Sequence, residues 1–258
     1  DQVLSTAHAY ALFQTASRAS GAAYRAAAEP GQTVSVDALI QAVEPATRIV
    51  AVANPGNPTG TRISNTEIRR LRDGLPEDVL LIVDEAYGEF ADHLDAPVFD
   101  LAERGDTVVL RTFSKAYALA GQRIGWGVMP EAIASDVRKL MNPNNVSAVS
   151  QAMAAAAMAD QPYMQGIVRR TTDERTRFCE ALDGLDLAPV SSDTNFALIP
   201  FADAAEAGSA DQVLRKRGVL MRGVAGYGLA HCLRATIGRP DQMDAAIAAL
   251  RAWRGRDL

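Results

Sequence analysis

The chain has 258 residues, of which 48% are hydrophobic and 22% charged, and its formal net charge is −5 at pH 7. This length and composition are typical of a globular protein with one large domain or two modest ones, and they exclude a disordered chain. The negative charge argues against a nucleic-acid partner, and the sequence has no apolar run long enough to cross a membrane. Two cysteines and three histidines, scattered along the chain, predict neither a disulfide framework nor a metal site.

The chain opens with DQVLSTAHAY, which has no initiating methionine and none of the charged and apolar regions of a signal or transit peptide. We therefore expect a cytoplasmic protein. The opening reads like the interior of a domain, and we expect that a segment of the same domain precedes residue 1.

Apolar runs of strand length alternate with helix-like stretches in the first half of the chain. Between two of these runs, Ser64 and Glu67 stand at the spacing of a capping box, which predicts a helix over 64–75. Strands separated by helices predict an α/β fold with a mostly parallel sheet that is covered on both faces. The predicted strands of this sheet are 47–55, 78–87 and 106–115.

After about residue 130 the pattern changes to that of a smaller α+β domain. We expect residues 1–160 to form the large domain and residues 161–258 the small one, which includes a long helix that links the two. The stretch 202–208 is expected to be a loop. The predicted helices of this part of the chain are 147–160, 163–185, 209–218 and 240–253, and the predicted strands are 194–201, 219–224 and 231–238.

Polar side chains stand at the ends of the three predicted strands of the large domain, namely Asn57, Asp84 and Lys115. In an open parallel sheet, ligands bind beyond the carboxyl ends of the strands, so we expect these side chains to face one site. Lys115 has small and apolar neighbours, and a desolvated lysine beside other positive charge has a lowered pKa that makes its amine a nucleophile toward carbonyls. An ordinary surface lysine is the alternative. The two other lysines, Lys139 and Lys216, stand in patterns typical of exposed helix faces.

The residues around Asn57 and Asp84 have chemistry of their own. The stretch ANPGNPTG predicts a rigid turn that holds the Asn57 amide, a donor for a phenolic oxygen, although a well-built loop is the simpler interpretation. Asp84 ends an apolar strand and therefore needs a cationic partner such as a protonated pyridine nitrogen, unless it caps a helix or joins an ion pair. Tyr87, three residues later, is placed to bond an oxygen on the same ring.

Three motifs in this order and spacing, NPGNPTG, DEAYGEF and TFSKAYALAGQRIGW, resemble those of the fold-type I pyridoxal-phosphate aminotransferases of class I/II. The tail SSDTNFALIPF…GVLMRGVAGYGLAHCLRATIG is similar to the histidinol-phosphate aminotransferase branch, so that the resemblance covers essentially the whole chain. It implies an aspartate aminotransferase-like fold, with a large domain built on a mostly parallel sheet and a smaller C-terminal α+β domain. It also implies pyridoxal 5′-phosphate as the cofactor and a homodimer with active sites at the subunit interface.

The resemblance implies a role for each polar residue of the motifs. Lys115 would form the imine with the cofactor's aldehyde and later move the proton. Asp84 would pair with the pyridinium nitrogen and keep the ring an electron sink, while Asn57 and Tyr87 would bond the ring oxygen. These assignments make Lys115, Asp84 and Tyr87 the catalytic residues.

The same resemblance implies which residues hold the cofactor's phosphate and which one stacks on its ring. Ser114 and Arg123, with help from Thr112, would hold the phosphate, and Arg123 would act as a bidentate clamp. Tyr10 matches the aromatic residue that stacks on the ring, although AHAY stands where the family usually has a proline before the aromatic; an ordinary half-buried tyrosine is the alternative. The family's Gly-Ala-Asp-like turn, whose N–H groups cradle the phosphate, and its N-terminal arm would both lie before residue 1.

The resemblance also implies that arginines in the tail bind the substrate. Arg234 in CLRATIG matches the arginine that binds the substrate's carboxylate or phosphate, and an arginine on an apolar strand is costly without an anionic partner. Arg222 would be a second anion contact or, alternatively, an exposed strand end. Asn57 would also face the substrate.

The implied reaction is amino transfer from histidinol phosphate, or from a related aromatic amino acid or amine, to 2-oxoglutarate. A threonine-phosphate decarboxylase-like enzyme is an alternative, because it would use the same lysine and aspartate and Arg234 would hold a phosphate. An aminotransferase-like sensor domain of a transcriptional regulator and a catalytically inactive relative are two further alternatives.

Overall fold

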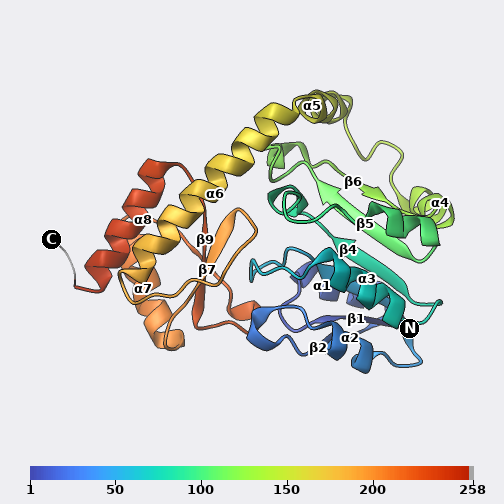
Figure 1. Ribbon diagram of the computed structural model, residues 1–258, viewed down its shortest axis with the longest axis horizontal. Coiled ribbons are helices and arrows are strands. Elements are labelled where there is room, and N and C mark those ends of the chain that lie inside the picture. The colour runs from blue at the N-terminus through green and yellow to red at the C-terminus, as the bar shows by residue number, and fades with distance from the viewer. Residues whose placement is uncertain (256–258) are drawn as a thin grey trace.

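A computed structural model describes residues 1–255 and contains two β-sheets (Figure 1). The larger sheet has six strands in the order β2-β1-β3-β4-β5-β6. Neighbours from β2 to β5 pair in parallel and β6 is antiparallel to β5, which confirms the expected mostly parallel sheet. These strands are β1 (Gln2–Thr6), β2 (Ala23–Ala27), β3 (Thr47–Ala53), β4 (Leu80–Asp84), β5 (Thr107–Thr112) and β6 (Gly125–Val128).

Side chains alternate across the larger sheet, as they must on a pleated strand, so each strand supplies apolar groups to both faces. On β3, Val50 and Val52 join the buried core that α2 and α3 complete, whereas Ile49 and Ala51 lie toward α1 on the other face. A parallel sheet is stable only with both faces covered, and these helices provide the cover. They are α1 (Ala11–Ala19), α2 (Val36–Ala42) and α3 (Asn65–Gly74).

The start of α3 shows how the sequence sets a helix boundary. Ser64 is the N-cap, and its side chain accepts a hydrogen bond from the backbone N–H of Glu67 at 3.3 Å. The Glu67 carboxylate does not complete the predicted capping box, because it bonds the Arg70 guanidinium instead, at 2.7 Å. Half of the box is enough to begin the helix at residue 65.

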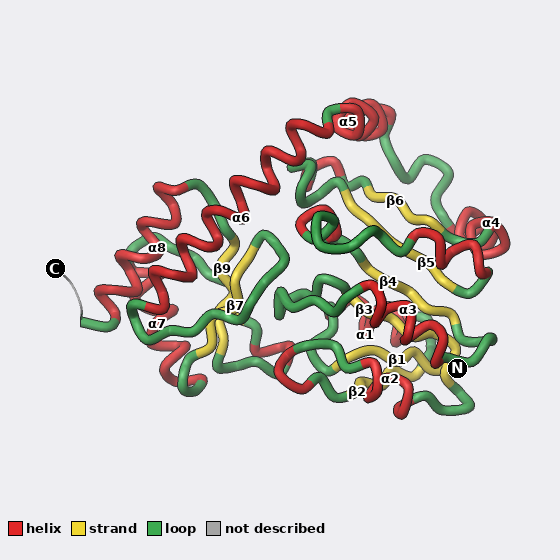
Figure 2. Tube along the Cα trace, in the orientation of Figure 1, coloured by secondary structure: helices red, strands yellow, loops and turns green. Residues whose placement is uncertain are grey.

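The smaller sheet is antiparallel, in the order β7-β9-β8, and α6, α7 and α8 pack against it around a second apolar core (Figure 2). The long helix α6 runs from the end of α5, beside the larger sheet, to the smaller sheet (Figure 1). The division into domains of residues 1–160 and 161–258 stays a prediction. The elements are α6 (Gln161–Asp183), β7 (Phe196–Pro200), α7 (Ala204–Lys216), β8 (Arg222–Gly223), β9 (Cys232–Thr236) and α8 (Pro240–Trp253).

Two predictions for this part of the chain were wrong in detail. Residues 202–208 are not a loop, because the Asp203 side chain accepts a hydrogen bond from the backbone N–H of Glu206 at 2.8 Å and so caps the first turn of α7. The strand predicted over 219–224 is reduced to the two residues of β8. At the start of α7 local hydrogen bonding, rather than the apolar pattern, sets the boundary.

The remaining helices connect these layers. Helices α4 (Glu131–Leu140) and α5 (Ala148–Ala159) are largely exposed; α4 buries no residue and α5 buries only two, Ser150 and Ala154. None of the helices within residues 1–255 has the length and apolar character needed to cross a membrane. Short 3₁₀ turns complete the chain: η1 (Pro30–Gln32), η2 (Gly88–Phe90), η3 (Phe99–Arg104), η4 (Ala120–Gln122) and η5 (Ala225–Tyr227).

Arg72 of α3 is a fully buried arginine that ties together the loops entering β4 and β5. Its guanidinium donates hydrogen bonds to the carbonyl oxygens of Val79 at 2.6 Å, Asp106 at 3.1 Å, Leu75 at 3.1 Å and Pro76 at 2.7 Å. Since buried carbonyls must be paired, these loops depend on one side chain.

We predict that Arg72→Leu lowers the free energy of unfolding by about 3–5 kcal/mol, because it leaves buried acceptors unpaired. Arg69→Leu is the matched control on the same helix. Arg69 pairs with Asp100 at the exposed surface, so its loss should cost less than about 1 kcal/mol. Urea unfolding of the two variants measures the difference, and equal losses would contradict the prediction.

Candidate active site

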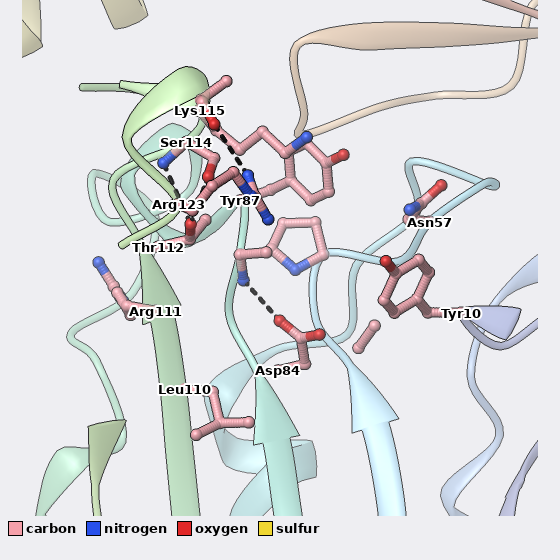
Figure 3. A pocket seen from close by; sticks show the side chains of 14 residues that line it. Tyr10, Asn57, Asp84, Tyr87, Leu110, Arg111, Thr112, Ser114, Lys115 and Arg123 are labelled. Carbon is pink, nitrogen blue, oxygen red and sulfur yellow. Dashed lines mark hydrogen bonds between the residues drawn. The ribbon is translucent and has the colours of Figure 1, made fainter. Parts of the chain in front are cut away.

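A cavity of about 280 Å³ opens at the carboxyl ends of β3, β4 and β5 (Figure 3). Parallel pairing brings these three strand ends to one edge of the sheet, as the sequence predicted. The loop that follows each strand supplies part of the wall. The lining residues include the predicted Tyr10, Asn57, Asp84, Tyr87, Thr112, Ser114, Lys115 and Arg123.

Asp84 is the last residue of β4, and its side chain faces the cavity beside Tyr10 (Figure 3). Its Oδ1 atom accepts a hydrogen bond from the backbone N–H of Ala86 at 2.9 Å. Burial raises the pKa of this carboxyl group, while the Ala86 N–H and the positive charge of Lys115 act in the opposite direction. The ionised form therefore favours a further cation in the cavity.

Lys115 lies in the loop after β5, and its Nζ atom is 5.3 Å from the centre of the Tyr87 ring. Burial lowers the pKa of the Lys115 amine, and the positive charges of Arg234 and Arg123 lower it further. Asp84 raises it but does not offset the other effects. More of this amine is unprotonated near neutral pH than in an ordinary lysine, which is what a nucleophile or a base requires.

Tyr87 stands in the wall beside Lys115. Its ring is buried and meets the Phe196 ring of β7 edge to face, with the ring centres 5.2 Å apart. Burial raises the pKa of the Tyr87 hydroxyl to about 12, so the phenol keeps its proton and acts as a hydrogen-bond donor.

Ser114, Thr112 and Arg123 form a second group of donors at the end of β5. The Thr112 hydroxyl donates a hydrogen bond to Ser114 Oγ at 2.9 Å and accepts one from the Ser114 N–H at 3.1 Å. Arg123 has a left-handed backbone, with φ of 49°, and its Nη1 atom donates to the carbonyl of Ala120 at 2.8 Å. No other donor of this guanidinium has a partner within residues 1–255. Hydroxyls beside a free guanidinium suit an anion.

Arg234 of β9 is not itself a lining residue of the cavity, but it contacts one, Asn57, from the smaller sheet. Its Nη1 atom donates a hydrogen bond to Asn57 Oδ1, in the turn that contains cis peptide bonds before Pro55 and Pro58. Its guanidinium carbon lies 4.7 Å from the centre of the Phe196 ring, a cation–π contact. The Nε atom is buried and has no hydrogen-bond partner within the described part of the chain. An unpaired buried donor of this kind marks a place for an anion.

Tyr10 and Arg222 are two predicted site residues that are exposed to solvent. Tyr10 precedes α1, lines the cavity and is 36% exposed; its ring meets Phe13 edge to face, with the centres 6.2 Å apart. Arg222 is exposed on β8 opposite Arg234, and it is not among the residues that line the cavity.

Arg111 also lines the cavity, and the sequence interpretation missed it. It lies on β5, almost fully buried, and bonds the carboxylates of Glu85 and Asp92, each at 2.7 Å. A Cβ atom on Gly88 would lie 2.6 Å from its guanidinium carbon, so a side chain there would displace the guanidinium from its present position. The signal was available, because an arginine inside an apolar strand needs an anionic partner, as was argued for Arg234.

Residues 1–250 match the family Aminotransferase class I and II. The chain is 41% identical over 252 residues to the histidinol-phosphate aminotransferase of Jannaschia sp. (strain CCS1), covering 98% of this chain and 70% of that protein. It is also 41% identical over 259 residues to the histidinol-phosphate aminotransferase of Paramagnetospirillum magneticum (strain ATCC 700264 / AMB-1), covering 99% of this chain and 71% of that protein.

A solved structure shows the same fold. The histidinol-phosphate aminotransferase from Sinorhizobium meliloti, in complex with pyridoxal-5'-phosphate, has a TM-score of 0.91 and 29% identity over 98% of this chain and 70% of its own. The resemblance seen in the three motifs and the tail is thereby confirmed. The chain belongs to the aminotransferase class I and II family.

Proposed function

We propose that this chain is a pyridoxal-phosphate-dependent aminotransferase that takes its amino group from histidinol phosphate and gives it to 2-oxoglutarate. One observation carries the proposal: the buried carboxylate of Asp84 and the amine of Lys115, with its lowered pKa, face the same cavity. The names of the relatives and the pyridoxal phosphate of the Sinorhizobium meliloti enzyme support the choice of reaction, donor and cofactor.

The side chains around the cavity fit pyridoxal phosphate. The buried Asp84 carboxylate suits a protonated ring nitrogen, and the Lys115 amine suits an aldehyde. Ser114 and the free donors of Arg123 suit a phosphate. Tyr10 would stack on the ring from the open side of the cavity.

Each of these residues would have a definite task. When bound, the cofactor supplies an aldehyde for amine exchange and a ring that withdraws electrons from the reacting carbon. Asp84 would hold the proton on the ring nitrogen, and Tyr87 and Asn57 would donate hydrogen bonds to the ring oxygen. Lys115 Nζ would accept the proton from the substrate's Cα, which its lowered pKa permits near neutral pH.

Arg234 would fix the anionic end of each substrate. Histidinol phosphate carries its phosphate on the CH2 group attached to its amine-bearing carbon, and 2-oxoglutarate carries a carboxylate next to its carbonyl. The unpaired Nε atom of Arg234 offers a donor to either group, and the guanidinium is already held by Asn57 and Phe196. One arginine would therefore serve the two half-reactions in turn.

We predict that Lys115→Ala reduces amino transfer at least about a thousandfold, because the nucleophile and the base are lost together. Borohydride reduction of the holoprotein, followed by digestion and mass spectrometry, should place the cofactor on the peptide that contains Lys115. Lys139→Ala and Lys216→Ala are the matched controls and should keep both the label and the activity. A label on either of those lysines, or release of carbon dioxide in place of oxo-product formation, would refute the proposed reaction.

A second prediction concerns Arg234. Arg234→Gln should raise the KM for histidinol phosphate and for 2-oxoglutarate about 10- to 100-fold, since a charge-assisted bond to the anion is lost. It should also raise the pKa of Lys115, because a neighbouring positive charge no longer opposes protonation. Mass spectrometry of acetic-anhydride labelling of the Lys115 peptide against pH, in the protein freed of cofactor, measures this shift, and Arg215→Gln on α7 is the control. An unchanged KM for both substrates would contradict the role of Arg234.

We further propose that the protein is a cytoplasmic homodimer. Exposed apolar side chains gather on α4, on α5 and just after α4, which is typical of a surface that another protein chain covers. A second copy of this chain would bury them across a two-fold axis. The side chains are Leu140, Met141, Val149, Met153 and Met158, which are 90%, 45%, 65%, 38% and 38% exposed.

Light scattering should therefore give the mass of two chains, and the double substitution Val149→Asp and Met153→Asp should give the mass of one. The added charges would have to be desolvated in the interface. Leu220→Asp is the control, because Leu220 is 74% exposed near the smaller sheet, away from these helices. A wild-type monomer would contradict the proposal.

A further inference from the structure

A second cavity, of about 600 Å³, lies between the turn that follows η2 and one face of α6. It shares no lining residue with the cavity at the strand ends. Its wall is partly apolar, through Met164 and Val168, and otherwise polar. The polar and charged lining residues are Glu89, Asp92, His93, Gln161, Gln165, Arg169, Thr172 and Asp173.

Glu89 is the buried carboxylate of this cavity. Its side chain is only 2% exposed, and neither of its carboxylate oxygens has a hydrogen-bond partner among residues 1–255. The closest cation is Arg111, whose Nη1 atom forms an ion pair with Glu89 Oε1 at 3.5 Å, a separation too long for a strong hydrogen bond. A carboxylate buried in this way is unfavourable unless something else binds it.

Arg111 neutralises Glu89 only in part, because it also binds two other carboxylates. Glu85 accepts hydrogen bonds from Nε at 2.9 Å and from Nη2 at 2.7 Å. Asp92 accepts from Nη1 and Nη2, both at 2.7 Å. Three carboxylates thus surround one guanidinium, and the group carries an excess of two negative charges when all are ionised.

A positively charged ligand in the cavity would offset this excess of negative charge. The Glu89 carboxylate lies in the wall of this cavity, so a guanidinium or an ammonium bound there would lie beside its negative charge. Met164 and Val168 suit an alkyl chain attached to such a group. Asp173 adds negative charge to the wall, whereas Arg169 adds positive charge.

We propose that this cavity binds a small organic cation, a guanidinium or primary ammonium on a short alkyl chain, with Glu89 as its counter-ion. The site is separate from the proposed reaction, and its occupation does not depend on it.

Calorimetric titration of the holoprotein with n-butylguanidinium tests the proposal, and n-butylurea, which has the same shape without the charge, is the control ligand. The cation should bind saturably to one site, and the urea should not. Glu89→Gln should weaken binding of the cation at least about tenfold, because it removes the paired charge. The exposed Glu77→Gln is the matched control variant and should leave binding unchanged.

A pH series gives a measurement on the wild-type protein alone. Burial raises the pKa of Glu89 to about 7, so the carboxyl group must lose its proton before the cation pairs with it. Affinity should rise roughly tenfold from pH 6 to pH 8, with release of a proton that calorimetry in different buffers detects. The other ionisable and charged groups near Glu89 are Glu85, Asp92, His93, Arg111, Tyr117, Arg169 and Asp173.

The outcomes divide cleanly. Absence of binding to the wild type, equal binding of the urea, or full affinity in Glu89→Gln would each overturn the proposal. Binding that appears only in Arg169→Gln would show that the chain's own arginine fills the cavity, and this too would overturn it. Loss of affinity and of its pH dependence in Glu89→Gln, with both kept in Glu77→Gln, would support it.

Discussion

Parallel pairing of β3, β4 and β5 sets Ala53 beside Asp84 and Asp84 beside Leu110, so the three strands end at one edge of the sheet. On β4, fully buried and partly buried side chains alternate, so a shift of one residue would exchange Leu81 and Val83 of the core with the more exposed residues and is unfavourable. The chain after each strand is then forced to leave from the same edge. The cavity and its polar groups follow from this register.

The part of the chain that carries the second sheet contacts residues of the cavity wall without lining the cavity itself. Arg234 reaches Asn57 and stacks on Phe196, which in turn packs on Tyr87. His8, two residues before Tyr10, donates a hydrogen bond from Nδ1 to the carbonyl of Tyr227 at 2.7 Å, since a carbonyl can only accept. A movement of the second sheet would therefore shift residues that we assign to cofactor binding and to substrate binding.

The sequence was enough to predict the parallel sheet and the residues at its strand ends, because both depend on short-range patterns. Asn57, Asp84 and Lys115 each follow an apolar run, and that rule needs no knowledge of distant contacts. Arg111 was missed because its partners, Glu85 and Asp92, come together only when β4 and β5 pair. The 202–208 stretch was missed for the opposite reason, since a purely local cap at Asp203 outweighed the absence of an apolar pattern. The placement of Arg222 outside the cavity depends on the position of β8, which no local pattern encodes.

The segment from Asp84 to Glu89 holds three carboxylates, those of Asp84, Glu85 and Glu89, whose pKa values are raised for the same reason, desolvation. In each case the folded protein binds a proton more tightly than the unfolded chain does, so the carboxyl group's contribution to stability is fully present below its ordinary pKa and is lost as the pH rises through the folded value. For Glu89 that window extends from its ordinary value to about 7. An uncharged side chain in place of Glu89 would avoid this loss of stability at neutral pH. At Asp84 the loss of stability is offset if the cofactor's protonated ring nitrogen brings a positive charge. Glu89 faces a different cavity, beside α6, so by the same reasoning a different cation would have to offset its charge.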